Sequence, residues 1–193
     1  MKKEILRINN LSVSPSSVQR LENVTLYILE GDMVGFLGLT YSGKDLMVRI
    51  LEGDMPEELR SHHIYIGGRR IAGNANMQGA VYRIAASNYM IDDWSVAEYV
   101  GLVESGWFQL MWKRRRLEEQ VKAFLKELHV ELDVSKKMKE LSELEKRIVD
   151  VAKAKWQGKK LLIVEDEFEG MGPESIRAFA AVMKRLVSRD MGV

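Results

Sequence analysis

Residues 38–45 read Gly-Leu-Thr-Tyr-Ser-Gly-Lys-Asp and follow the phosphate-binding pattern G-x-x-x-x-G-K-[ST] at every fixed position except the last. Gly38 and Gly43 let the backbone approach a phosphate closely enough for its N–H groups to point at it. Lys44 supplies a cation for the terminal phosphates, and the positive end of a following helix adds to the attraction. Asp45 stands where the pattern needs a Ser or Thr hydroxyl to ligate Mg²⁺. The stretch therefore predicts a nucleotide-binding loop with an altered metal position.

The sequence on both sides of this loop supplies the context that a phosphate-binding loop requires. Residues 32–37 form a short apolar run that is suited to a buried strand. Apolar residues recur at helical spacing over 46–51, and Gly53 follows as a stop. The alternative is a plain strand-to-helix turn with an incidental lysine. Motif and context together favour the phosphate loop.

The composition limits the classes of protein to which the chain can belong. The chain has 193 residues, of which 46% are hydrophobic and 30% charged, as in one globular domain or one domain with two lobes. A formal net charge of +1 gives no overall attraction to nucleic acid, and the absence of cysteine excludes disulfides and thiolate metal sites. The amino terminus lacks a signal-like apolar region, and no stretch approaches the roughly 18 apolar residues of a membrane span. We expect a cytoplasmic location.

Apolar patterns divide the chain into a β-rich part and a helical part. Runs that predict strands are residues 4–10, 22–29, 32–37, 64–66, 80–84 and 160–164. Glu30 and Gly31 alone separate two of these runs, which predicts a hairpin-like connection. Two stripes at helical spacing follow, over 117–128 and 141–152, with a polar loop at 131–138 between them. Pro173 is placed to begin a final helix.

With the phosphate loop, the helical stretch and an acid-ended strand in this order, the chain resembles the ATP-binding subunits of ABC transporters. It is most similar to the branch that imports ribose, galactose and related sugars. The likeness spans essentially all 193 residues, and the stretches that carry it besides the loop are residues 6–12, 21–26, 30–32, 50–53, 94–98 and 151–154.

The resemblance implies an α/β fold: a P-loop NTPase core of the ABC-ATPase type with an antiparallel β portion and a helical lobe. It implies one nucleotide-binding domain that is incomplete at its carboxyl end. Residues 1–88 and 159–193 would form the core lobe, and residues 89–158 the helical lobe.

The resemblance also implies a set of site residues, with ATP and Mg²⁺ as cofactors. Residues that would hold the nucleotide are Gly38, Ser42, Gly43, Lys44, Asp45 and the signature residue Ser142. Glu165 and Asp45 would be nearest the metal. Asp166 occupies the position of the general base, where it is one methylene shorter than the family's Glu.

Several positions depart from the family pattern. Ala86 replaces the glutamine that links the γ-phosphate and the metal to the membrane partner. The signature Leu-Ser-Gly-Gly-Gln becomes Leu141-Ser-Glu-Leu-Glu145, whose two carboxylates would repel a phosphate. Pro15 replaces the aromatic residue that stacks on adenine. These departures imply that hydrolysis is lost or severely impaired.

Asp45 has two interpretations. Its carboxylate could ligate Mg²⁺ directly, or it could pair with Lys44 and fill the phosphate site internally, which we favour. Repulsion against a phosphate about 4 Å away would be on the order of 1–4 kcal/mol at effective dielectric constants between 80 and 20.

Two functional hypotheses follow. The first is an ATP-binding cassette, or half of one, that binds nucleotide at most. It would pair with a second cassette as a homodimer, a heterodimer or a tandem half, and with a transmembrane permease at the inner face of the membrane. The second is a pseudo-ATPase that binds no nucleotide and acts as a regulatory or scaffold module through the apolar residues 107–112. A fully active ATPase is the weakest alternative.

Overall fold

The computed structural model describes residues 2–15, 20–39, 41–54, 63–71, 79–85, 90–101, 107–165, 171–187 and 190–193, and only the backbone over 107–113. The chain forms two compact units. The core unit comprises Met1–Arg83, Lys159–Glu165 and Val187–Val193, and the helical unit comprises Ile84–Gly158 and Asp166–Leu186. The final helix groups with the helical unit in this division. The predicted lobes, residues 1–88 with 159–193 and residues 89–158, stay a prediction.

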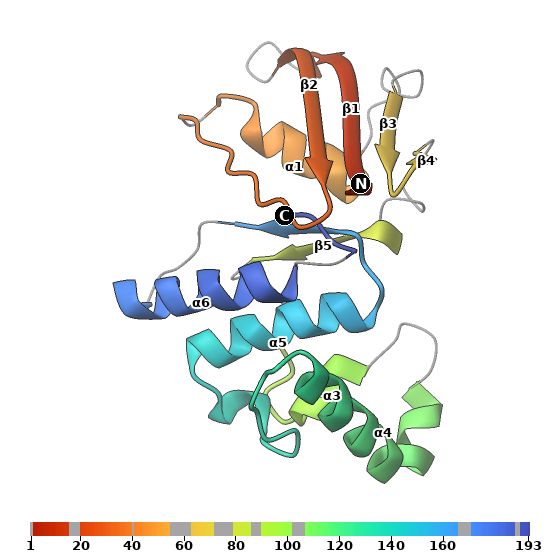
Figure 1. Ribbon diagram of the computed structural model, residues 1–193, viewed down its shortest axis with the longest axis vertical. Helices are drawn as coiled ribbons and strands as arrows, with labels where there is room; N and C mark the ends of the chain where they lie inside the picture. The colour runs from red at the N-terminus through yellow and green to blue at the C-terminus, as the bar shows by residue number, and fades with distance from the viewer. Residues whose placement is uncertain are drawn as a thin grey trace. The chain divides into compact units, whose positions relative to one another are not determined.

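The core unit contains a four-stranded antiparallel sheet in the order β2-β1-β3-β4 (Figure 1). Its strands are β1 (Glu4–Val13), β2 (Leu21–Leu29), β3 (His63–Ile66) and β4 (Arg69–Arg70). The side chains of Leu6, Ile8 and Leu11 are fully buried. The strands predicted over 4–10, 22–29 and 64–66 are confirmed.

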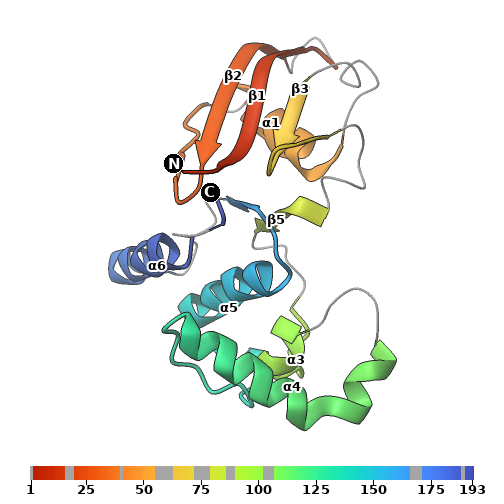
Figure 2. The ribbon, with the colours of Figure 1, turned by 45° about the vertical axis from the view of Figure 1, so that its right-hand side comes forward.

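Helix α1 (Lys44–Glu52) covers one face of this sheet, as Figures 1 and 2 show. Its apolar residues recur at helical spacing and are buried in the same core as the strands, together with Leu161. Gly53 ends the helix in the left-handed conformation, with φ of 103°. The helix and its stop are both confirmed.

Residues 32–37 do not form the predicted strand. Asp32 and Val34 exchange backbone hydrogen bonds with Val193, at 3.0 and 2.7 Å. Beyond Val34 no backbone hydrogen bond to another described residue extends the pairing, so the chain continues as the coil between β2 and α1 in Figure 1. The hairpin at Glu30 and Gly31 is also wrong, because β2 pairs with β1 instead. The apolar side chains expected to be buried are largely exposed, Leu37 completely.

Strands β5 (Val81–Ile84) and β6 (Leu161–Val164) pair with each other in a second sheet. Beside them, the backbone N–H of Lys160 donates to the carbonyl of Ala80 at 2.7 Å. Gly192 lies along β6, where its carbonyl accepts from the N–H of Leu162 at 2.9 Å. The strands predicted over 80–84 and 160–164 are confirmed.

The helical unit is built from short and long helices around an apolar interior. They are α3 (Val96–Gly101), α4 (Trp107–Glu127), the 3₁₀ turn η2 (Met138–Glu140), α5 (Glu143–Trp156) and α6 (Pro173–Leu186). Helix α3 packs on α4 and α5, and α5 packs on α6. The helical stripes and the start of α6 at Pro173 are confirmed. Within the described residues, we find no helix with the length and apolarity that a membrane span demands.

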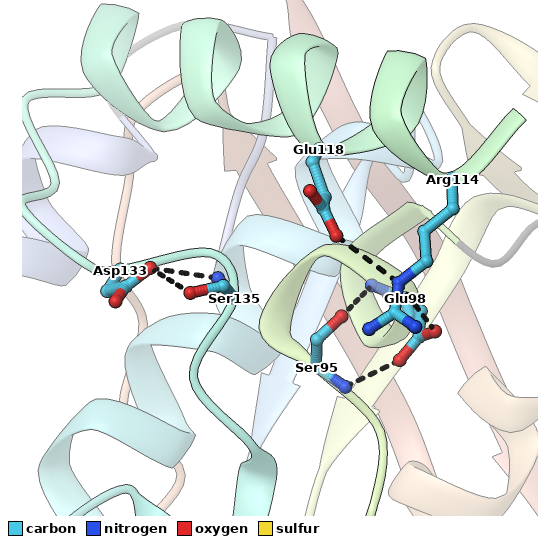
Figure 3. Close-up of polar contacts among 6 residues, drawn as sticks. All are labelled: Ser95, Glu98, Arg114, Glu118, Asp133 and Ser135. Carbon is cyan, nitrogen blue, oxygen red and sulfur yellow. Dashed lines mark hydrogen bonds and ion pairs between the residues drawn. The ribbon is translucent and has the colours of Figure 1, made fainter.

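Polar contacts join α3 to α4 (Figure 3). Ser95 and Glu98 form a reciprocal cap at the start of α3: the Ser95 N–H donates to Glu98 Oε2 at 2.7 Å, and the Glu98 N–H to Ser95 Oγ at 3.2 Å. Arg114 of α4 lies within ion-pair distance of Glu98 and Glu118, at 3.6 and 3.3 Å. In the loop after α4, Asp133 accepts hydrogen bonds from the N–H and the hydroxyl of Ser135.

A buried polar group joins α3 to α5. Asp150 is fully buried and accepts a hydrogen bond from the Tyr99 hydroxyl at 2.7 Å. The ammonium of Lys153 lies 3.8 Å from the centroid of the Tyr99 ring. Burial lowers the pKa of Lys153, and the charge of Asp150 opposes that shift. Two helices are thus attached to each other by a hydrogen bond to a carboxylate away from water.

Candidate nucleotide-binding site

Gly43 begins α1 in a conformation that only glycine adopts without strain. Its φ is 90°, and a Cβ on this residue would lie 2.8 Å from the carbonyl oxygen of Arg20. Gly43 has no side chain, so the residue at the start of the helix provides no side-chain acceptor for the first N–H groups of α1. The start of α1 therefore requires glycine at position 43, which is a fixed position of the phosphate-binding pattern.

Ser42 and Gly38 lie against each other within the loop. A Cβ on Gly38 would lie 2.4 Å from Ser42 Oγ, so a larger residue there would require the Ser42 side chain to move. The Ser42 N–H donates to the carbonyl of Leu39 at 3.1 Å, and Tyr41 has a positive φ of 66°. Ser42 is thus held close to both Leu39 and Gly38. The roles of Gly38, Ser42 and Gly43 toward a phosphate stay predictions.

Lys44 and Asp45 are both exposed at the start of α1. In the described part of the chain, no ion pair joins them, so the internal pairing that we favoured is not found. The reason is geometric, since consecutive residues of a helix point in different directions. Asp45 instead places a negative charge in the first turn, where it interacts favourably with the helix dipole.

Glu165, at the end of β6, is held by an arginine. Arg83 of β5 donates from Nη2 to Glu165 Oε2 at 2.6 Å, and from Nη1 to Glu52 Oε1 at 3.2 Å. The hydrogen bond to Glu165 is the main cause that raises the pKa of Arg83. The Arg83 side chain thus lies between two carboxylates.

The residues present do not fit a Mg²⁺ ion shared by Glu165 and Asp45. Magnesium needs carboxylate oxygens at about 2.0–2.1 Å, and the Glu165 carboxylate is already bound to a guanidinium. Through Arg83 it is linked to Glu52 at the far end of α1, eight residues beyond Lys44 and about 12 Å along the helix axis. No group of three His, Asp or Glu side chains gathers among the residues that the structure describes. Asp166 and Ala86 lie outside those residues.

Ser142 is the amino-terminal cap of α5. Its hydroxyl oxygen accepts a hydrogen bond from the Glu145 N–H at 3.3 Å, and Glu145 Oε2 accepts from the Ser142 N–H at 2.7 Å. The Ser142 N–H is the main cause that lowers the pKa of Glu145. A carboxylate of the chain itself therefore satisfies this end of α5, where the resemblance predicts a phosphate contact. That contact stays a prediction.

Sequence reasoning missed two of these arrangements. The spacing Ser142-x-x-Glu145 before an apolar stripe is the pattern of a capping box and could have been recognised. Arg83 offered a weaker signal, a lone cation inside the short strand Val81–Ile84. Its partners Glu52 and Glu165 are 31 and 82 residues away, so only the fold brings them together.

We expect the cap of α5 to depend on pH. Because the folded pKa of Glu145 lies below the ordinary value of a glutamate, its contribution to stability is present above that ordinary pKa and is lost as pH falls through the folded pKa. Glu145→Gln should therefore lower the free energy of unfolding by about 0.5–1 kcal/mol at pH 7 and by nearly nothing at the acid end. Urea unfolding of both proteins from pH 7 downward measures this difference.

The matched control is Glu119→Gln, which neutralises an exposed glutamate on α4. It should change stability little at any pH. A difference between the wild type and Glu145→Gln that does not vary with pH would contradict the assignment.

Several curated proteins are similar to this chain over most of its length. The ribose import ATP-binding protein of Caldanaerobacter subterraneus subsp. tengcongensis is 25% identical over 188 residues, which cover 94% of this chain and 37% of that protein. The xylose/arabinose import ATP-binding protein of Sulfolobus acidocaldarius is 21% identical, with coverage of 98% of this chain and 76% of that protein. The chain spans little more than a third of the ribose and arabinose import proteins that it matches.

Solved structures show the same fold. The cbiO1 protein of Clostridium perfringens, part of the ABC transporter complex cbiONQ, has a TM-score of 0.75 at 19% identity, with coverage of 99% of this chain and 78% of that one. An ATP-binding cassette of an ABC transporter in its ADP conformation also has a TM-score of 0.75, at 18% identity, with coverage of 98% and 79%. The fold is therefore the α/β fold of ABC-type ATP-binding cassettes.

The family follows from the sequence match as well as from the fold. The family model described as "ABC transporter" matches residues 21–168, which contain the phosphate loop, the capped start of α5 and the acid-ended β6. This chain belongs to the ABC transporter family.

Proposed function

We propose that the chain is an ATP-binding cassette of a sugar importer, that it binds ATP at the loop of residues 38–45, and that its hydrolysis is impaired. The observation that carries the binding is the start of α1. Gly43 has the left-handed conformation, Lys44 is exposed, and the glycine itself provides no side-chain acceptor for the first N–H groups. A phosphate at this position would meet both backbone donors and a cation.

Three features support impaired hydrolysis. Asp45 replaces the hydroxyl expected to ligate Mg²⁺, and Glu165 is paired with Arg83. Asp166 is shorter than the residue that the resemblance implies as general base, and a misplacement of about 1 Å can reduce a rate about a hundredfold. The first two features would weaken the binding of the metal and the third would slow proton removal from the attacking water, so their effects would combine.

The proposed partners follow from the relatives. Proteins that import ribose, arabinose and xylose are similar to this chain. We therefore propose a sugar as the imported solute, a second cassette as the dimer partner and a transmembrane permease as the membrane partner. The location would be cytoplasmic, at the inner face of the membrane.

The runner-up is a pseudo-ATPase that binds no nucleotide and regulates or supports a partner. The self-capped start of α5 favours it, because Glu145 already provides the anion for that helix. The apolar residues 107–112, which the sequence analysis offered as its docking surface, lie where the structure describes the backbone alone.

Titration calorimetry with ATP tests the proposal. The wild type should release or absorb heat on binding at micromolar to millimolar ATP, and Lys44→Ala should lose this signal because the cation for the phosphates is gone. Phosphate release should stay at background. The absence of heat at millimolar ATP would contradict the proposed ATP binding. ATP turnover above background would contradict the proposed impairment of hydrolysis.

A further inference from the structure

We propose that Arg83 is a built-in cation for Glu165, which excludes a divalent metal from the acidic end of β6. The three residues involved, Arg83, Glu165 and Glu52, belong to the core unit. The proposal rests on the proposed function in one respect only: ATP at the loop of residues 38–45 would be bound without a metal held by Glu165.

The geometry is that of a cation between two anions. Arg83 is the third residue of β5, and Glu165 directly follows β6, the strand paired with β5. Arg83 Nη2 lies 2.6 Å from Glu165 Oε2, while Nη1 lies 3.2 and 3.4 Å from the two oxygens of Glu52. One planar group thus binds a carboxylate through each of its two terminal nitrogens.

This arrangement occupies one oxygen of Glu165 and places a positive charge beside the other. A dication at Glu165 would have to displace the guanidinium from Oε2, or bind at Oε1 with that positive charge within a few Å. The guanidinium does not leave by deprotonation, because arginine stays charged in proteins. The hydrogen bond from Arg83 to Glu165 raises the arginine pKa further.

Partial burial makes this ion pair stronger than an ordinary surface pair. The side chains of Arg83, Glu165 and Glu52 are 34%, 26% and 32% exposed. Another ion pair of the same unit, Arg49 with Asp54, has exposures of 55% and 58%. Water screens the charges of that pair more fully, so it serves as a matched control.

The experiment measures Mn²⁺ binding without nucleotide, from the loss of the free-ion signal in electron paramagnetic resonance. The wild type and the control Arg49→Gln should leave the signal unchanged. Arg83→Gln removes the positive charge but keeps a polar, unbranched side chain, and it leaves Glu52 and Glu165 as carboxylates without that cation. It should bind Mn²⁺ at least about tenfold more tightly than the wild type, because one unit charge is removed from the site.

A double variant, Arg83→Gln with Glu52→Gln, tests the proposal even if the single variant Arg83→Gln does not fold. It removes the repulsion between the two carboxylates and still releases Glu165. It should bind Mn²⁺ more tightly than the wild type, with helix and strand content checked by circular dichroism. Wild-type Mn²⁺ binding that Glu165→Gln abolishes would overturn the proposal, and so would a folded double variant that binds no better than the wild type. Because no nucleotide is present, a failure to bind ATP leaves this test unaffected.

Discussion

Asp45→Asn is expected to tighten the binding of ATP, measured by calorimetry in the presence of EDTA. The carboxylate of Asp45 is exposed in the first turn of α1, the place where the terminal phosphates of a nucleotide would lie. Two like charges about 4 Å apart repel by about 1 kcal/mol in water and about 4 kcal/mol at an effective dielectric constant of 20. Removing the charge should therefore increase affinity by roughly fivefold to several hundredfold.

The variant Asp45→Thr distinguishes the effect of the carboxylate charge on ATP affinity from the effect of the missing metal ligand. Threonine removes the same charge and adds the hydroxyl that the pattern requires. If repulsion is the main defect, both variants gain equally in EDTA. Asp54→Asn, which removes an exposed charge just beyond the other end of α1, should leave affinity unchanged. Equal affinities of the wild type and Asp45→Asn would show that the carboxylate is not what limits binding.

Tyr99→Phe is expected to destabilise the helical unit by about 2–3 kcal/mol. The Tyr99 hydroxyl donates to Asp150, a carboxylate with no exposure to water. Hydrogen bonds to charged groups contribute about 1.5–3 kcal/mol, and a buried acceptor that loses its donor suffers the larger part of that loss. The ring itself stays, so its packing and its contact with Lys153 remain.

Tyr27→Phe is the matched control for this prediction. The Tyr27 hydroxyl also donates a hydrogen bond, to Asn9 at 2.8 Å, but its side chain is exposed on β2. Its loss should change stability by no more than about 0.5 kcal/mol. Urea unfolding measures both values, and hydrogen exchange should place the loss for Tyr99→Phe in α3 and α5. Equal effects of the two substitutions would argue that burial of Asp150 is unimportant.

The helices and strands that could be predicted correctly are those whose sequence pattern does not depend on which other element they pack against or pair with. Helix α1 was predicted from apolar residues at helical spacing and from Gly53. Strand β6 was predicted from an apolar run whose side chains are buried or half-buried in the structure. Such patterns reflect the burial of one face of a helix or of both faces of a strand, and any α/β fold must bury these faces. The strand at 32–37 was the exception, because a strand also needs neighbours to complete its hydrogen bonds, and Val193 supplies them only as far as Val34.

The candidate site was predictable only in part. The motif marked Gly43 as a residue that lets the backbone approach a phosphate, and the structure adds its left-handed conformation at the start of α1. The formation of ion pairs between side chains, by contrast, depends on the fold, which can join residues far apart in the sequence. Asp45 could not turn toward its neighbour Lys44, and Glu165 found a partner in Arg83 that no spacing in the sequence indicates. The charge of a residue can be taken from the sequence, but the partner that neutralises it depends on the fold.

The exposed coil between β2 and α1 affects how these experiments should be done. Phe36, Leu37, Leu39 and Tyr41 are 49%, 100%, 85% and 65% exposed, so the folded protein presents a row of apolar side chains to water. Fluorescent dyes that report unfolding by binding apolar surface would already bind this row in the native state. Melting curves from such dyes would begin at a high signal and hide small shifts. Calorimetry, circular dichroism and intrinsic tryptophan emission avoid the problem, since none of them requires a probe that competes for that surface.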